Sequence, residues 1–138
     1  MEDAVVFTGF VPMEEGWRYV ARAAVAVSPF YPIPILRSTS PTKLVEYMAM
    51  GKPVVANDHP EQRKVIAESG GGICVAYDEA AFADAVVELL SNPDKASIMG
   101  RRGRRYVEEY RSYAVLADQV EQRYLELCRG IPEMLDSN

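Results

Sequence analysis

The sequence predicts a single α/β domain, in which a parallel β-sheet is covered by helices on both faces. Its 138 residues suit one hydrophobic core, because single domains usually hold about 100–200 residues. Hydrophobic residues make up 49% and charged residues 25%, which is typical of globular domains and excludes wholesale disorder and fibrous repeats. Short apolar runs also alternate with helical patterns, as they do in doubly wound parallel sheets.

The first elements alternate between strand and helix before a long loop. Residues 4–7 form a short run rich in Val and Phe and are predicted to be a buried strand. Apolar side chains recur on one side of residues 13–24, which predicts a helix, and the AVAVS run at 24–28 predicts a second strand. Residues 29–40 contain three prolines, which predict a long loop without regular structure.

The rest of the chain alternates once more and then becomes wholly helical. Gly51 and the glycine run at 70–72 are interpreted as helix ends, and the run lacks the GxGxxG spacing of a dinucleotide-binding loop. The sheet therefore has about four strands, residues 1–129 form the domain and residues 130–138 form a flexible tail. The remaining predicted helices are 41–50, 60–69, 79–90, 93–109 and 113–128, and the remaining predicted strands are 54–56 and 73–76.

Charge, cysteine and histidine usage exclude several kinds of site. The net charge of −5 argues against nucleic acid as a partner, and the arginine cluster at 101–105 is expected to be a solvated face because acidic residues share its helix. Two cysteines are too few for a disulfide framework, and no apolar stretch approaches the ~20 residues that span a bilayer, so a cytoplasmic setting is expected. The sole histidine, His59, excludes a histidine-containing metal cluster and is expected to line a cleft.

The start of the helix predicted at 41–50 carries the most informative chemistry. Ser40 is placed to cap it and Pro41 to begin it, so the free backbone N–H groups belong to Thr42 and Lys43. A cation at Lys43 opposes the helix dipole by up to ~1 kcal/mol. This placement is explained if Lys43 and the helix start bind an anion such as a phosphate together. The alternative is that Lys43 points into solvent.

Glu46 strengthens the case for a nucleotide site. It lies one turn beyond Thr42, on the same edge of the predicted helix. A carboxylate in this place can accept two hydrogen bonds from a ribose diol, as acidic residues do in other nucleotide sites. The alternative is an ion pair between Glu46 and Lys43.

Residues 40–56, SPTKLVEYMAMGKPVVA, resemble the nucleotide-sugar-binding signature of group 1 glycosyltransferases with the GT-B fold. The flanking segments 6–10 (VFTGF), 71–75 (GGICV) and 93–110 are similar to the family as well, so the resemblance covers nearly the whole chain. It implies a Rossmann-like parallel sheet that forms the later part of the C-terminal, donor-binding domain. By the same resemblance, this domain is truncated at its N-terminus, and the acceptor and the N-terminal acceptor-binding domain are absent from this chain.

The resemblance also implies the activity and the residues that bind the donor. The intact enzyme would transfer a sugar from a nucleoside diphosphate sugar with retention and without a metal or another cofactor, while this chain alone would be inactive. Glu46 would bind the ribose, and Ser38 stands where many members have a glutamate that touches the sugar. The predicted donor-binding residues are Arg37, Ser38, Ser40, Thr42, Lys43, Leu44 and Glu46.

The sequence leaves two alternative functions open. One alternative is a non-catalytic nucleotide-binding module, and the other is an α/β interaction module. The resemblance also leaves peripheral membrane association of the full-length protein open.

Overall fold

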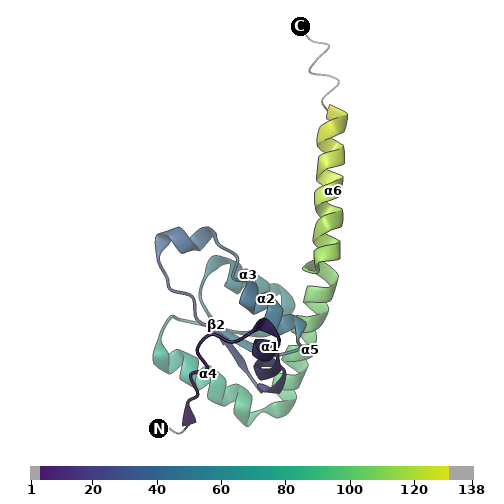
Figure 1. The fold of residues 1–138 in the computed structure, drawn as a ribbon. Helices are drawn as coiled ribbons and strands as arrows, with labels where there is room; N and C mark the ends of the chain where they lie inside the picture. The colour runs from purple at the N-terminus through teal and green to yellow at the C-terminus, as the bar shows by residue number, and fades with distance from the viewer. Residues whose placement is uncertain (1–3, 131–138) are drawn as a thin grey trace.

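The computed structural model describes residues 4–130 and contains a three-stranded parallel sheet with helices on both faces (Figure 1). The strands lie in the order β1-β2-β3, and both pairings are parallel. In chain order the elements are α1 (Met13–Arg22), β1 (Ala26–Ser28), the 3₁₀-helix η2 (Pro34–Ser38), α2 (Thr42–Ala49), β2 (Val54–Asn57), α3 (Pro60–Ser69), β3 (Gly72–Val75), α4 (Glu79–Ser91), α5 (Pro93–Tyr110) and α6 (Tyr113–Gly130).

The sheet buries side chains on both faces, as the doubly wound class requires. Val54 and Ala56 of β2 pack on one face with Leu44 of α2 and with side chains of α3 and α5. Val55 points to the opposite face and packs with Leu89 of α4. Because helices cover both faces, β2 is buried throughout its length, which explains the apolar run at residues 54–56.

The prediction of a strand at residues 4–7 is wrong. Residues 5–12 have no helix or strand, and the Phe7 side chain is 93% exposed. Valine and phenylalanine favour a strand only where a neighbouring strand supplies hydrogen bonds and a covered face. Among the described residues β1 pairs only with β2, so the sheet has three strands rather than about four.

The loop at residues 29–40 is only partly irregular. The predicted absence of regular structure over 29–40 is wrong in part, because η2 forms there with Pro34 at its first position, where a missing N–H costs nothing. The other helices and strands form within two residues of the predicted bounds. The tail predicted at 130–138 lies, except for Gly130, outside the described residues.

Helix α5 packs against the end of α2 through glycine contacts. A Cβ atom on Gly100 would lie 2.1 Å from the carbonyl oxygen of Gly51, so the two backbones approach as closely as glycine permits. Gly51 has a φ of 70° and Gly70 a φ of 60°, which confirms both as helix ends. Helix α2 is therefore held between the sheet and α5, with its first turn at the carboxyl end of the strands.

Helix α6 extends away from the sheet and from the other helices (Figure 1). Its side chains at residues 116–129 are exposed. No helix between residues 4 and 130 is both long enough and apolar enough to cross a membrane.

Candidate functional site

The first turn of α2 presents unpaired backbone N–H groups, as predicted. The N–H of Leu44 donates to the carbonyl of Pro41 at 3.3 Å, which leaves Thr42 and Lys43 without an acceptor inside the helix. The prediction that Ser40 caps the helix is wrong. Pro41 occupies the capping position with an extended backbone (φ −66°, ψ 103°), and no side chain caps the helix.

A hollow of about 520 Å³ lies between α2 and the junction of α5 with α6. Ligand sites of drug-sized molecules have volumes of roughly 300–1,000 Å³, so the hollow is large enough for a nucleoside. Thr42 and Glu46 lie side by side in it, as their spacing of one helical turn predicted. The residues that line the hollow are Ser40, Thr42, Val45, Glu46, Ala49, Val107, Glu108, Arg111, Ser112, Tyr113 and Leu116.

Arg111 brings a positive charge to the wall opposite Glu46. Its Nη2 forms an ion pair with Glu61 at 3.0 Å, and its Nε donates to the hydroxyl of Tyr106 at 3.4 Å. The hydrogen bond to Tyr106 contributes most to raising the pKa of Arg111, so the guanidinium stays charged. No sequence signal links Arg111 to Glu46, because only the packing of α5 on α2 brings them together.

Lys43 leaves the hollow and turns toward the end of β1. Its Nζ donates to the carbonyl of Pro29 at 2.9 Å and lies 5.9 Å from the centre of the Phe30 ring. The ion pair with Glu46 that the sequence left open is not formed between these two described residues. Partial burial lowers the pKa of Lys43 by desolvation. An ammonium has three N–H donors, so two remain for an anion after the bond to Pro29.

The other predicted donor-binding residues lie around this site. Leu44 is buried in the core, so only its backbone can reach a ligand. Arg37 and Ser38 are exposed on η2 and lie outside the lining of the hollow. The structure therefore brings Ser40, Thr42 and Glu46 into one hollow, leaves Arg37, Ser38 and Lys43 on neighbouring surfaces and buries the Leu44 side chain.

His59 does not line a cleft, contrary to the prediction. It is 3% exposed, its ring lies edge-on to Phe30, and its Nε2 is 2.7 Å from the carbonyl oxygen of Leu36. Its neighbour Asn57 is fully buried and contacts the same loop, but it was not among the predicted site residues. The available signal was the position of Asn57 directly after the apolar run at 54–56, where ligand-binding loops of parallel sheets begin.

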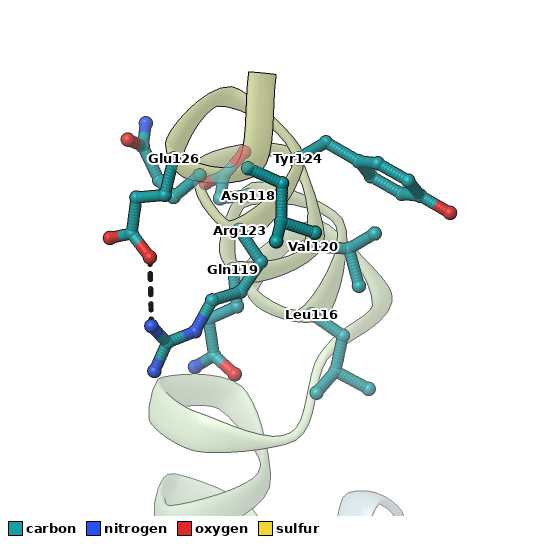
Figure 2. Close-up of a pocket in the computed structure, with 9 residues that line it drawn as sticks. Leu116, Asp118, Gln119, Val120, Arg123, Tyr124 and Glu126 are labelled. Carbon is teal, nitrogen blue, oxygen red and sulfur yellow. Dashed lines mark hydrogen bonds and ion pairs between the residues drawn. The ribbon is translucent and has the colours of Figure 1, made fainter. Parts of the chain in front are cut away.

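A larger hollow of about 790 Å³ runs along α6 (Figure 2). Leu116, Val120 and Tyr124 point to one side of the helix, while Arg123 and Glu126 form an ion pair of 2.8 Å on another (Figure 2). All of its lining residues come from this single helix, so no side chains from different elements converge there. The hollow beside α2 is therefore the stronger candidate for a binding site.

The charged residues of α5 form a solvated face, as predicted. Arg104 pairs with Glu108 at 2.7 Å and Arg105 with Glu109 at 2.8 Å, each one helical turn apart and exposed. Between residues 4 and 130, no three His, Cys, Asp or Glu side chains lie close enough together to hold a metal ion.

The fold and the place of the hollow are those of a ligand-binding, doubly wound α/β domain. In doubly wound α/β domains, ligands bind outside the carboxyl ends of the strands, which is where α2 begins. The family model described as glycosyl transferases group 1 matches residues 1–92. The chain belongs to this family, whose enzymes have the GT-B fold, and it corresponds to a portion of their C-terminal domain.

Two relatives and one solved structure show how much of such enzymes the chain represents. It is 38% identical over 88 residues to alpha-maltose-1-phosphate synthase of Mycolicibacterium smegmatis, and 40% identical over 82 residues to phosphatidyl-myo-inositol mannosyltransferase of Mycobacterium leprae. These matches cover 58% and 59% of the chain but 22% of each relative. The structure of sucrose-phosphate synthase from Thermosynechococcus elongatus is similar with a TM-score of 0.80 and 29% identity, over 93% of this chain and 31% of that one.

Proposed function

We propose that this chain is the donor-binding part of a glycosyltransferase that transfers a sugar from a nucleoside diphosphate sugar to an acceptor, with retention of the anomeric configuration. Membership of the family supports sugar transfer. The observation that best supports the donor site is that one hollow contains both Glu46 and the uncapped first turn of α2. In this proposal the acceptor is bound by a part of the protein that this chain does not contain.

Each group in the site has a role that follows from its chemistry. The Glu46 carboxylate accepts hydrogen bonds from the ribose diol. The N–H groups of Thr42 and Lys43, the positive end of the helix dipole and the Lys43 ammonium bind the diphosphate. Negative charge grows on the diphosphate as the bond to the sugar breaks, so these donors stabilise the transition state more than the ground state.

An NMR titration of the chain with UDP, GDP and ADP tests this proposal. We expect at least one nucleotide to shift the amide signals of residues 40–46. The Glu46→Ala variant should bind it about tenfold or more weakly, because hydrogen bonds to a charged group contribute about 1.5–3 kcal/mol.

The control is Glu14→Ala, which removes an exposed carboxylate from α1, outside the hollow. It should bind the nucleotide as the wild type does. If none of the three nucleotides binds, or if both variants lose the same affinity, the donor site is not where we place it.

A further inference from the structure

The end of β2 and the turn that follows it carry two buried polar side chains that hydrogen-bond to the main chain of the loop at residues 29–40. Asn57 binds both polar backbone atoms of Phe30: its Oδ1 accepts from the N–H at 2.6 Å, and its Nδ2 donates to the carbonyl at 3.0 Å. His59 Nε2 donates to the carbonyl of Leu36 at 2.7 Å. Because a carbonyl can only accept, Nε2 carries the proton. The loop is thus tied to the end of β2 near its start, and to the residue that precedes α3 near its end.

A second layer of buried polar groups fixes the first. Gln62 donates from its Nε2 to the backbone carbonyl of Asn57 at 3.2 Å, and its Oε1 accepts from the Ser28 hydroxyl at 2.6 Å. Gln62 and Ser28 are both fully buried. The Phe30 ring packs edge-on to the His59 ring with 4.8 Å between their centres. Asn57 and His59 therefore lie in a packed polar network with little freedom to reorient.

This network has a cost in stability. The Nδ1 atom of His59 is buried without a hydrogen-bond partner, and an unsatisfied buried polar group costs about 1–3 kcal/mol. An apolar ring in the same place would avoid that cost while keeping the contact with Phe30. We therefore explain the histidine by its hydrogen bond to Leu36, which fixes the conformation of the loop, rather than by a gain in stability.

Leu36 directly precedes the part of the loop that carries predicted donor-binding residues. Arg37 and Ser38 follow it in η2, and Ser40 lies in the wall of the hollow. The Leu36 carbonyl also accepts hydrogen bonds from the Thr39 hydroxyl at 2.6 Å and from the Thr39 N–H at 3.1 Å. The place of Leu36 thus sets where the side chains of residues 37–40 point.

We propose that Asn57 and His59 are positioning residues of the donor site. They hold the loop at residues 29–40, and with it the Pro29 carbonyl and the Phe30 ring that Lys43 contacts, in the conformation in which Lys43 binds the donor diphosphate. This inference rests on the proposed function. A loop that is ordered in advance loses less conformational freedom when the ligand binds, and the affinity is higher for that reason. A loosened loop should lose affinity for the diphosphate, whereas the ribose bound by Glu46 is held by α2.

Two variants of His59 separate its hydrogen bond from its packing. His59→Phe keeps a ring beside Phe30 but cannot donate, whereas His59→Gln keeps an N–H donor for Leu36. The ligands are the nucleoside diphosphate that binds the wild type and its nucleoside. We expect His59→Phe to weaken the diphosphate about tenfold and the nucleoside less than about twofold, while His59→Gln stays within about twofold of the wild type for both. Amide hydrogen exchange of residues 30–40 should become faster in His59→Phe alone.

Every outcome decides for or against the positioning role. The role is refuted if His59→Phe binds the diphosphate like the wild type, if it weakens both ligands equally, or if glutamine fails to restore affinity. If His59→Phe does not fold, Asn57→Ala removes both hydrogen bonds to the Phe30 backbone, and unchanged diphosphate affinity in that variant refutes the role. A wild type that binds no nucleotide overturns the proposed function as well. Normal binding by His59→Phe beside lost binding by Glu46→Ala overturns the positioning role alone.

Discussion

Lys43 lies where the helix dipole disfavours a cation, and two contacts within the domain compensate for this position. The carbonyl of Pro29 accepts a hydrogen bond from its Nζ, and the face of the Phe30 ring lies 5.9 Å away. Burial still disfavours the charged form and lowers the pKa of Lys43. A bound diphosphate would offset this effect, because an adjacent anion favours the ammonium.

The lowered pKa of Lys43 predicts how nucleotide affinity changes with pH. Deprotonation removes the charge that attracts the diphosphate, so affinity falls as the pH rises, and the fall begins below the range of an ordinary lysine. Titrations from neutral to alkaline pH measure it. In Lys43→Arg the guanidinium stays charged throughout, so the additional fall should disappear. The nucleobase titrates identically in both proteins, and equal pH profiles would show that Lys43 does not bind the diphosphate.

At the residue scale, local spacing could predict the residues on α2 but not the loop contacts of Asn57 and His59. Thr42 and Glu46 share an edge because they lie one helical turn apart, and the hollow contains both. The cap at Ser40 was mispredicted because the extended backbone of Pro41 moves the helix start by one residue. Asn57 and His59 contact residues far away along the chain, and such contacts depend on how the loop packs rather than on any local pattern.

At the scale of elements, periodicity predicted all six α-helices of the described residues and all three strands, within two residues at each end. It failed at residues 4–7 because composition reports an intrinsic preference, whereas a strand also needs a partner. It failed at η2 because proline excludes the interior of a helix but not its first turn. Glycines were interpreted as helix ends, and the close approach of α5 to Gly51 could not be read from the sequence.

Two glycine substitutions test whether this close approach holds α2 in place. In Gly100→Ala the new Cβ would lie 2.1 Å from the Gly51 carbonyl oxygen, so α5 must move away and the free energy of unfolding should fall by about 2–4 kcal/mol. Gly16→Ala is the matched control: it also lies in a helix, with nothing within 4 Å of the new Cβ, and should stabilise the protein by about 0.5–1 kcal/mol. Urea denaturation followed by circular dichroism measures both, and similar effects would contradict the packing argument.

At the scale of the whole molecule, apolar side chains remain uncovered at two places. Val6, Phe7 and Phe10 are exposed before α1, and Val120 and Leu127 are exposed along α6. Large exposed apolar surfaces commonly mark contacts with other protein segments. The matched relatives are several times longer than the part that corresponds to this chain. Both facts agree with the proposal that this chain supplies the donor half of a larger transferase.

If the acceptor half lies elsewhere, the chain by itself should bind a nucleotide without transferring a sugar. A nucleoside diphosphate at a hundred times its Kd should stabilise the fold by about 2.7 kcal/mol, which raises the Tm by about 10 °C for a domain of this size. UDP-, GDP- and ADP-glucose should release their nucleotide no faster in the presence of the chain than in buffer, because a donor half offers its site to solvent and lacks an acceptor held in line with the sugar. Thermal unfolding and a coupled assay of released nucleotide measure the two effects. Nucleotide release that the chain accelerates and that Glu46→Ala abolishes would show that these residues form a working catalyst without a second half.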